Sequence, residues 1–480
     1  MNEKLLRFSV NDEWRIHDAY EGTIIFGGNG SGKTTGSGKD LAKSLLTAGF
    51  GGLILTVKID ESDRWQDYLK QAGRIDDMLM FEPDGSQVFN FLDYEASRQG
   101  SGSGLTYELV NILQMAMDGG RERAKSDNPF WDDAVSQLLT NSIDLVTISE
   151  MPLSLESVVD VIRTAPLSVQ DVSTLGFTEE QVRNHRAQFG SVWAEDSTCA
   201  QLLLRSYLRT KNSVDLPASR RSDFAETYKF FTNEWPTLDP RTRSNILSTL
   251  MTRLTCLLRS PFRQLFCGQT TITPDQTFEG KVVILNLPVK KFGESGRFAQ
   301  ILFKTIWQRA VERRGSQGKP VFLWADEAQF FVTKYDMQFQ QTARSSRAAS
   351  VYLTQSVVNF RASLDSANST NISDSLLGNL QTKIFHANAC PLTNEYAQKL
   401  FGEEMQTVVG HTTSQAGRSN SFSKTILPIL PAIRFTVIRK GGSSNNKIVE
   451  AYIFQAGRVW KGDDGKHSKN WILAAFKQDG

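Results

Sequence analysis

Cysteine and histidine are both scarce in this sequence of 480 residues, and neither gathers into a motif. The four cysteines form no CxxC pair, which is typical of reduced thiols in a cytosolic protein and argues against a disulfide framework. The five histidines are equally scattered, so no metal site built from histidine and cysteine is visible. These residues are Cys199, Cys256, Cys267, Cys390, His17, His185, His386, His411 and His467.

Long apolar runs and an excess of one charge are also missing. The first residues, MNEKLLRFSVNDEW, lack the apolar core of a signal peptide, and no later run approaches the roughly 20 apolar residues of a membrane-spanning helix. We therefore expect a cytoplasmic protein without a membrane segment of its own, which a partner could recruit to a membrane. Lys and Arg number 54 and Asp and Glu 52, so the net charge of +2 demands no polyanionic partner. It does not exclude one, because a few basic side chains can line a narrow channel.

A glycine-rich loop separates the first strand candidate from a helix. The strand candidate is Gly22–Phe26, and a second apolar candidate, Gly52–Val57, follows after a segment of helical length. The order strand, glycine loop, helix, strand is a βαβ unit and predicts a parallel sheet. Strand and helix patterns alternate again later, with strand candidates at residues 281–287, 320–325, 350–354 and 383–385. The sequence therefore predicts an α/β fold with a mainly parallel sheet flanked by helices.

The loop itself, Gly27-Gly-Asn-Gly-Ser-Gly-Lys-Thr34, matches the Walker A pattern GxxxxGK[ST]. Its glycines allow backbone N–H groups to surround phosphate oxygens, and the helix that follows adds a favourable dipole. We expect Lys33 to reach the β- and γ-phosphates of ATP and the Thr34 hydroxyl to bind Mg²⁺. A chance glycine-rich turn is the alternative, and the flanking strand and helix argue against it. The predicted nucleotide-binding residues are Gly27, Gly28, Asn29, Gly30, Ser31, Gly32, Lys33, Thr34 and Thr35.

A second glycine run, Gly36–Lys39, does not repeat the Walker A pattern. Asp40 stands where a serine or threonine should follow the lysine. Two glycines are unusual at this point, because glycine costs about 1 kcal/mol relative to alanine inside a helix. We interpret the run as the flexible start of the helix.

An apolar strand candidate that ends in two carboxylates, Val321-Phe-Leu-Trp-Ala-Asp-Glu327, fits the Walker B pattern. The carboxyl ends of parallel strands meet at one edge of a sheet, so these carboxylates should lie beside the P-loop. We expect Asp326 to hold Mg²⁺, directly or through water, and Glu327 to polarise the attacking water. Gln355, directly after the next strand, is expected to sense the γ-phosphate. A polar residue that only caps the strand end is the alternative.

Two arginines, Arg344 and Arg347, precede that last strand. An arginine supplied across a subunit boundary can stabilise the charge of a phosphoryl-transfer transition state. Either residue could instead be a solvated helix-face residue, which is the commoner fate of a lone arginine.

Between the two strand-rich parts, apolar residues recur at helical spacing and predict a mostly helical insertion. The expected organisation is a nucleotide-binding domain whose first part is residues 1–105 and whose second part is residues 261–480. Residues 106–260 form the inserted helical domain in this prediction. Near the C-terminus, residues 409–424 are rich in Ser, Gly and Thr and predict a mobile loop. A C-terminal β-hairpin is predicted at residues 434–460, with its turn at residues 441–446.

Together these residues resemble the coupling-protein ATPases of conjugative and type IV secretion systems, which belong to the hexameric DNA-pumping motors. The resemblance runs from about residue 20 to about residue 460. Besides the Walker motifs it includes Arg344, eleven positions before Gln355, and the strand Gln381–Phe385, which leads into a helix. Further matching positions are Lys58, Asp60, Asn128–Asp132, Thr393 and Glu395.

The resemblance implies a RecA-like P-loop motor domain with a helical insertion. It further implies a homo-hexamer that binds ATP between neighbouring subunits and moves DNA through its centre. Arg344 falls at the family's arginine-finger position, and Arg347 falls where the family often has glycine. Family members usually carry transmembrane helices before the motor, whereas this sequence starts almost directly on it. A soluble relative with another duty therefore enters as an alternative.

The leading expectation is an ATPase of the coupling-protein type that translocates DNA, with Glu327, Arg344 and Gln355 as catalytic residues. One alternative is a soluble relative that acts on a protein cargo or a partner nuclease in a mobile-element or defence system. Another is a nucleotide-dependent scaffold with little hydrolysis, which the three catalytic candidates argue against. Other transfer, secretion or defence proteins are expected as partners. A basic set in the helical part is a candidate for DNA contact, although a solvated helical face is the commoner reading. Its members are Arg205, Arg209, Arg220 and Arg221.

Overall fold

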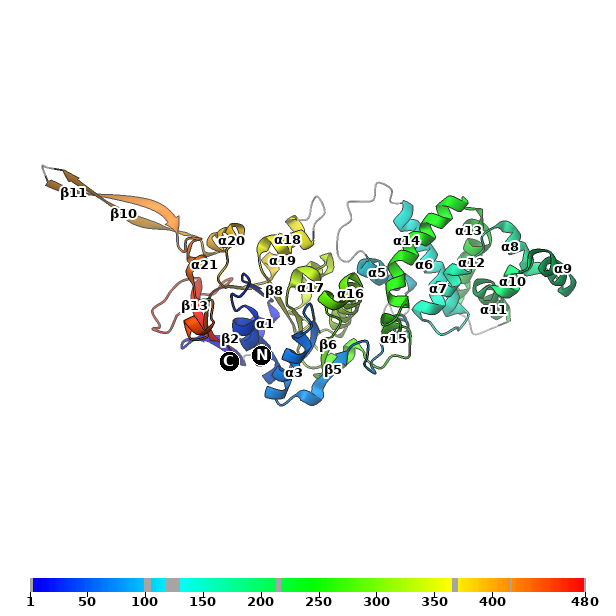
Figure 1. The fold of residues 1–480 in the computed structure, drawn as a ribbon, viewed down its shortest axis with the longest axis horizontal. Helices are drawn as coiled ribbons and strands as arrows, with labels where there is room; N and C mark the ends of the chain where they lie inside the picture. The colour runs from blue at the N-terminus through cyan, green and yellow to red at the C-terminus, as the bar shows by residue number, and fades with distance from the viewer. Residues whose placement is uncertain are drawn as a thin grey trace.

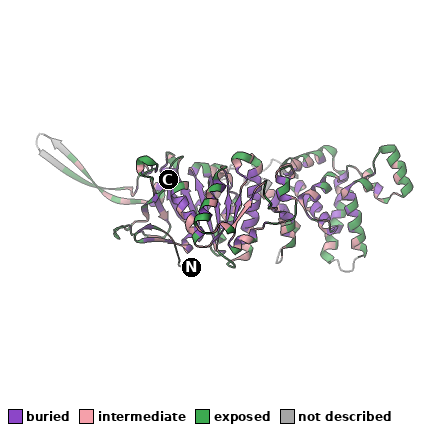
Figure 2. Cartoon of the chain, turned by 60° about the horizontal axis from the view of Figure 1, so that its bottom comes forward, coloured by how far each residue is buried: buried purple, intermediate pink, exposed green. Residues whose placement is uncertain are grey.

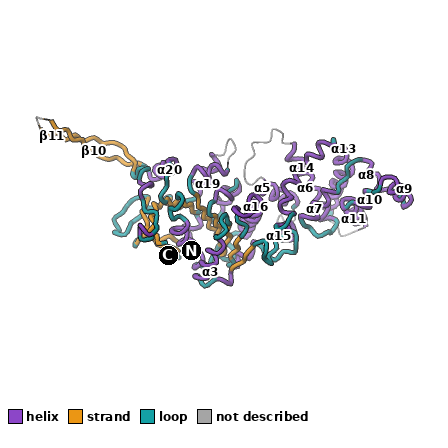
Figure 3. The backbone as a smooth tube through the Cα atoms, in the orientation of Figure 1, coloured by secondary structure: helices purple, strands orange, loops and turns teal. Residues whose placement is uncertain are grey.

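The computed structural model describes residues 3–98, 105–117, 130–212, 217–364, 370–414 and 417–478. The molecule is elongated, with a sheet in the middle, a helical part at one end and a β-ribbon at the other (Figure 1). Figure 3 shows the same division by secondary structure. None of the helices in these ranges is long and apolar enough to cross a bilayer. Of the matching segment Asn128–Asp132, the first two residues lie outside the described residues.

A sheet of nine strands forms the centre of the described structure, in the order β13-β12-β9-β3-β8-β7-β4-β6-β5. The strands from β9 to β5 pair in parallel, and β12 and β13 extend the sheet as antiparallel neighbours. The predicted α/β fold with a mainly parallel sheet is therefore confirmed. The strands are β3 (Thr23–Phe26), β4 (Gly51–Leu55), β5 (Met78–Phe81), β6 (Val282–Leu285), β7 (Val321–Ala325), β8 (Ala348–Thr354), β9 (Thr382–Phe385), β12 (Ile448–Gln455) and β13 (Trp471–Lys477).

The central strands are apolar runs because both faces of the sheet are covered. In β3, Ile24 and Phe26 point into one core and Ile25 points into the other. Helices on one face are α1 (Ile16–Tyr20), α2 (Lys39–Thr47) and α3 (Glu61–Gln71). Helices on the other face are α16 (Val289–Arg314), α17 (Lys334–Thr342), α18 (Val357–Ser363), α19 (Thr370–Asn379) and α20 (Pro391–Phe401).

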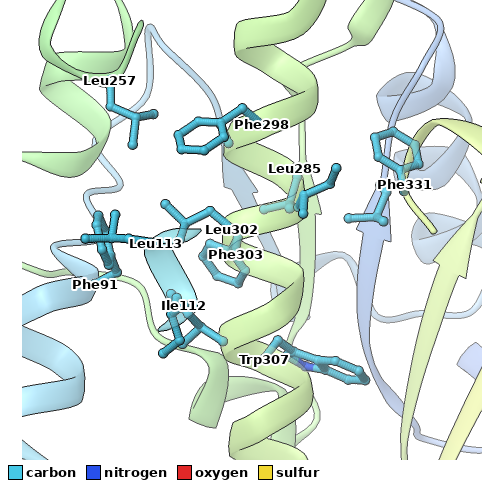
Figure 4. Packing of buried hydrophobic residues seen from close by; sticks show 14 of the residues in the cluster. Phe91, Ile112, Leu113, Leu257, Leu285, Phe298, Leu302, Phe303, Trp307 and Phe331 are labelled. Carbon is cyan, nitrogen blue, oxygen red and sulfur yellow. The ribbon is translucent and has the colours of Figure 1, made fainter. Parts of the chain in front are cut away.

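Helices fill the chain between β5 and β6, and they share a core with the sheet. Figure 4 shows Ile112 and Leu113 of one of these helices, α5, against Leu302 and Phe303 of α16. The helical part is thus packed onto the sheet layer. Its helices are α4 (Phe91–Ser97), α5 (Thr106–Met117), α6 (Phe130–Ile148), α7 (Leu155–Arg163), α8 (Val169–Ser173), α9 (Glu179–Phe189), α10 (Trp193–Asp196), α11 (Thr198–Asn212), α12 (Ala218–Lys229), α13 (Trp235–Thr237), α14 (Pro240–Leu258) and α15 (Phe262–Phe266).

The loop predicted at residues 409–424 is wrong. The described residues of this range belong to an antiparallel hairpin of β10 (Glu403–Ser414) and β11 (Gly417–Pro428), which we call the arm. Its described residues are largely exposed, in contrast to the buried sheet (Figure 2). The prediction took the Ser, Gly and Thr content as a sign of a loop, although threonine, and the valine and phenylalanine in the same segment, favour strands.

The hairpin predicted at residues 434–460 is also wrong. The segment begins with a short helix, α21 (Arg434–Val437), and contains one strand, β12. That strand pairs with β9 and with β13, which lies beyond residue 460. The chain does turn at the predicted residues 441–446, where Gly441 and Gly442 have φ angles of 84° and 76°, but only one antiparallel bridge between described residues, Lys440 to Val449, closes the turn. Sequence spacing alone did not reveal which strand would be the partner. A separate hairpin at the N-terminus consists of β1 (Lys4–Ser9) and β2 (Asp12–Arg15).

Candidate nucleotide-binding site

The predicted phosphate-binding loop connects β3 to a helix that starts with a π-helical turn, Thr34–Gly38, and continues as α2. The peptide N–H of Gly28 donates to the carbonyl oxygen of Ala387 at 3.0 Å, which fixes the loop against the end of β9. Gly30 and Gly32 have φ angles of 68° and 82°, in the left-handed region that glycine enters at least cost. These glycines are therefore required by the backbone of the loop.

The second glycine run begins the helix, as predicted, but it is buried within the fold. A Cβ atom on Gly38 would lie 2.7 Å from the carbonyl oxygen of Lys33, and one on Gly36 would lie 3.3 Å from the Cβ of Val449. The helix start is wedged between the P-loop and the C-terminal strands, so it has no room for larger residues. This close approach explains two glycines at positions where glycine is otherwise unfavourable.

The two Walker motifs meet at the carboxyl ends of the parallel strands, as predicted. The Thr34 hydroxyl donates to a carboxylate oxygen of Asp326 at 2.9 Å across 292 positions of sequence. The Lys33 ammonium lies 3.4 Å from a carboxylate oxygen of Glu327, and both side chains are buried. In the sheet, β8 lies between β3 and β7 and brings Gln355 to the same edge.

Glu327 is held by several side chains in a backbone conformation that is uncommon outside glycine. Its φ of 51° places it in the left-handed region, which costs on the order of 1 kcal/mol and needs support from the surroundings. Gln329 donates to its carboxylate at 2.9 Å, and Gln355 does so at 3.5 Å. Burial alone would raise the pKa of Glu327, but Lys33, Gln329 and Lys58 together lower it below its ordinary value. The carboxylate is therefore ionised at neutral pH.

Lys58 and Glu61 form a further charged group beneath the Walker B carboxylates. The Lys58 ammonium lies 3.7 Å from Asp326, 3.9 Å from Glu327 and 3.9 Å from Glu61. Burial, together with the charge of Asp326, raises the pKa of Glu61 to about 7. Sequence reasoning noted Lys58 only as a matching position and missed Glu61 and Gln329. Glu61 stands in an ordinary polar stretch without a distinguishing signal, whereas Gln329 follows Glu327 by two positions, and that position was the available signal.

A cavity of about 470 Å³ opens in front of these residues. The P-loop lines one wall, and Lys58, Arg64 and Lys290 add positive charge around it. The buried Ser31 hydroxyl has no hydrogen-bond partner among the described residues. A polyanion that accepts hydrogen bonds fits this cradle, and a Mg²⁺ ion fits the hydroxyl–carboxylate pair of Thr34 and Asp326, since Mg²⁺ takes oxygen ligands and keeps several waters.

Neither predicted finger arginine is among the residues that line this cavity in the described structure. Arg344 follows α17 rather than lying within it, and its side chain is 69% exposed with one ion pair, 3.2 Å to Glu21. The Arg347 guanidinium donates to the carbonyl oxygens of Ser316 and Gly318 at 3.3 and 3.2 Å. Arg344 is thus the more available of the two for an external partner.

A segment after β9 links the P-loop to Gln355. The Asn388 side chain donates to the carbonyl oxygen of Gln355 at 2.7 Å, next to the contact of Ala387 with the P-loop. The His386 ring contacts the Ser37 hydroxyl at 2.6 Å. Burial lowers the pKa of His386 to about 3, so the ring is neutral at physiological pH. This segment was also missed, because an isolated His or Asn in a sequence carries no positional signal.

The basic set proposed in the helical part lies on α11 and α12. Arg209 there donates to the carbonyl oxygen of Ile148 at 2.6 Å and pairs with Glu150 at 2.5 Å. These contacts tie α11 to the end of α6, so Arg209 is explained by the packing of the helices.

The fold is similar to that of the bacterial conjugative coupling protein TrwB. The trigonal form of TrwB in complex with sulphate matches with a TM-score of 0.58 and 12% identity, covering 100% of this chain and 90% of that chain. The unbound monoclinic form matches with a TM-score of 0.57 and 13% identity, covering 99% and 88%. A complex of TrwB with ADP and Mg²⁺ matches with a TM-score of 0.57 and 12% identity, covering 100% and 90%.

No protein-family model matches the sequence, and no curated protein matches it. The structural likeness extends over nearly the whole chain, from the P-loop sheet through the helical part. At sequence identities of 12–13%, this structural likeness is evidence for a shared fold alone. The resemblance drawn from the sequence is thereby confirmed at this level: the chain has the RecA-like P-loop fold of the conjugative coupling proteins.

Proposed function

We propose that this chain is an ATPase of the coupling-protein type, which assembles as a homo-hexamer and couples ATP hydrolysis to the movement of DNA. The observation that carries the proposal is the convergence of Lys33, Thr34, Asp326 and Glu327 on one cavity. The TrwB fold supports it, and so does the binding of ADP and Mg²⁺ by TrwB. The DNA cargo is the part that rests on the family resemblance alone.

In this proposal each side of the cavity has its own task. The loop Gly27–Thr35 binds the phosphates, with the Lys33 ammonium turning from Glu327 toward the β- and γ-phosphate oxygens. Thr34 and Asp326 hold Mg²⁺, which neutralises charge on the phosphates when bound. Glu327, ionised at neutral pH, orients and polarises the attacking water.

The finger arginine comes from a neighbouring subunit in this proposal. Arg344 is exposed and lies outside the cavity of its own chain, as a residue that acts in trans must. Gln355 reaches both the Glu327 carboxylate and, through its backbone, Asn388. That position suits a residue that senses the γ-phosphate.

The test is steady-state ATP hydrolysis by the parent and by Glu327→Gln, with and without single- and double-stranded DNA. We expect Glu327→Gln to lower kcat by roughly 100-fold or more while ATP still binds, because the carboxylate acts on the water and not on the nucleotide. Glu279→Gln, an exposed carboxylate at the end of a surface turn, is the matched control and should leave kcat unchanged. Parent-like turnover by Glu327→Gln would contradict the choice of this residue.

The response to DNA separates the cargo alternatives. Stimulation by DNA that weakens as salt rises supports the translocase. Strong hydrolysis that is indifferent to DNA would instead favour a protein cargo or a partner nuclease. Tight ATP binding without hydrolysis under any condition would favour the scaffold. Mixing Arg344→Ala with Lys33→Ala subunits should restore some activity if the arginine acts in trans.

A further inference from the structure

The arm leaves the body of the molecule with little support of its own. Its strands, of 12 residues each, pair along their whole length, and the base packs against α20. Beyond that base the strands extend away from the body (Figure 1). An isolated two-stranded hairpin is only marginally stable in water. We therefore expect the arm to bind a partner that stabilises it.

Side chains alternate between the two faces of the arm, and the faces differ in chemistry. Beyond Glu404 at the base, the opposite face carries Gln406, Gly410 and Ser423, and also Val408, which is 43% exposed. One face, here called the ribbon face, is exposed and combines apolar, cationic and amide groups; Phe422 on it is 70% exposed and Met405 66%. Beyond the pair Glu403–Pro428 at the base of this face, the cross-strand pairs that make up the ribbon face are Met405–Ile426, Thr407–Lys424, Val409–Phe422 and His411–Asn420.

Beyond Glu403 and Glu404 at its base, the arm has no acidic residue. Neither Asp nor Glu occurs from Met405 to Val449, although the chain as a whole has 52 of them against 54 Lys and Arg. At the base of the arm, Glu404 is paired with Lys469 at 2.8 Å. The exposed cations of this segment that have no acidic partner within the described ranges are Lys424, Arg434, Lys440 and Lys447. Of the arm's own charged residues, Glu403 and Glu404 lie at the base and Arg418 and Lys424 lie beyond it, so the arm beyond its base carries a net positive charge.

We propose that the ribbon face of the arm binds duplex DNA, an inference that rests on the proposed function for its choice of polyanion. A two-stranded β-ribbon fits the major groove of B-DNA, where lysine contacts phosphates and amide or hydroxyl groups contact base edges. Lys424, Asn420 and Thr407 supply those groups, and Phe422 supplies an apolar contact to the bases.

A lipid surface fits the arm less well. A ribbon that enters a membrane needs its apolar residues at the end that inserts. The large apolar side chains of the ribbon face lie between the base and the middle of the arm, at Met405, Val409, Phe422 and Ile426. The sequence from Gly410 to Ser421, around the tip, contains only small and polar residues. This distribution suits contact with a hydrated groove.

The experiment compares the full-length double variant Phe422→Ala/Lys424→Ala with Ser423→Ala/Thr425→Ala, which changes the opposite face of the same strand. Binding of a short fluorescent duplex is measured by anisotropy over a range of salt concentrations. We expect the ribbon-face variant to raise the Kd roughly 10-fold and to reduce the slope of log K against log salt by about 1, since one phosphate contact is lost. The opposite-face variant should bind as the parent does. Thermal unfolding of both variants checks that the body is intact.

The outcomes separate this inference from the proposed function. If the parent binds duplex DNA and the ribbon-face variant binds it equally well, the arm is not the DNA site, while the motor proposal stands. If the parent hydrolyses ATP and binds no DNA, both the DNA cargo and the DNA-binding arm are overturned. Loss of binding to anionic phospholipid vesicles, or a changed oligomeric state, with DNA binding unaltered, would assign the ribbon face to a membrane or to a second copy of this chain.

Discussion

The central sheet and the arm are both made of hydrogen-bonded strands, but they bury their side chains to opposite extents. Strands β3, β6 and β7 are buried at every residue, whereas the ribbon face of the arm is exposed throughout its described length. A residue in the sheet is therefore fixed by contacts on all sides, and its replacement disturbs the packing of the residues around it. In the arm the same residue type faces solvent and contributes little to stability. Three matched pairs of substitutions test this difference.

The largest effect is expected for a buried ion pair. Lys304 is paired with Asp336, both side chains are fully buried, and Lys304 also donates to the carbonyl oxygen of Phe331 at 2.7 Å. Lys304→Met should lower the free energy of unfolding by about 4 kcal/mol, because it leaves an uncompensated buried carboxylate. Lys469→Met removes an ion pair with Glu404 whose side chains are both 40% exposed, so it should cost less than about 1 kcal/mol. Urea unfolding measures both, and equal losses would contradict the comparison.

A smaller effect is expected where glycine is required by packing. A Cβ on Gly51, at the start of β4, would lie 1.8 Å from the backbone carbonyl oxygen of Thr277. Gly51→Ala should therefore destabilise the protein by about 3 kcal/mol, since the sheet must shift to accept it. On the arm, a Cβ on Gly410 meets the Ser421 hydroxyl at 2.6 Å, and that side chain can rotate away. Gly410→Ala should leave the unfolding midpoint close to that of the parent.

The smallest effect concerns the stability of the sheet in acid. Burial, with a smaller repulsion from Lys33, lowers the pKa of His386 from its ordinary 6.5 to about 3. Unfolding allows the ring to take up a proton below pH 6.5, so its contribution to stability is complete above that pH and falls as the pH drops toward 3. Between pH 7 and pH 5 the loss should be about 2 kcal/mol.

His386→Gln should remove that part of the acid sensitivity, which urea unfolding at pH 7 and pH 5 would measure. His411→Gln, on the exposed arm, is the matched control and should follow the parent at both pH values. An unchanged pH dependence in His386→Gln would show that this ring is not buried as the fold implies.

The sequence was a good guide where a function or an element depends on neighbours along the chain. The P-loop Gly27–Thr34, its strand and helix, and the Walker B strand before Asp326 were all located from local patterns. The same local reasoning failed for the arm, since serine and glycine content suggested a loop. It failed again for β12, whose partner strand comes from a later part of the chain.

Most of the second layer around the site could not be predicted. Glu61 and Asn388 come near Asp326 and Gln355 only after distant segments are brought together, whereas Gln329 contacts Glu327 from two positions along the chain. Glu61 and Asn388 are common polar residues in segments without periodicity, so their sequence context does not mark them as site residues. The same holds for Gly36, whose need for space depends on Val449, a strand residue more than 400 positions away.

The sequence by itself determined which strands form the centre of the fold and where the glycine loop between β3 and its helix lies. Apolar runs must be buried on both faces, and the GxxxxGK[ST] spacing between a strand and a helix is a local pattern that needs no tertiary contact to be recognised. Tertiary structure alone decided the pairing of Thr34 with Asp326, the charge environment of Glu327 and the projection of the arm from the body. Contacts of this kind depend on which surfaces meet in space, and that is a property of the whole folded chain.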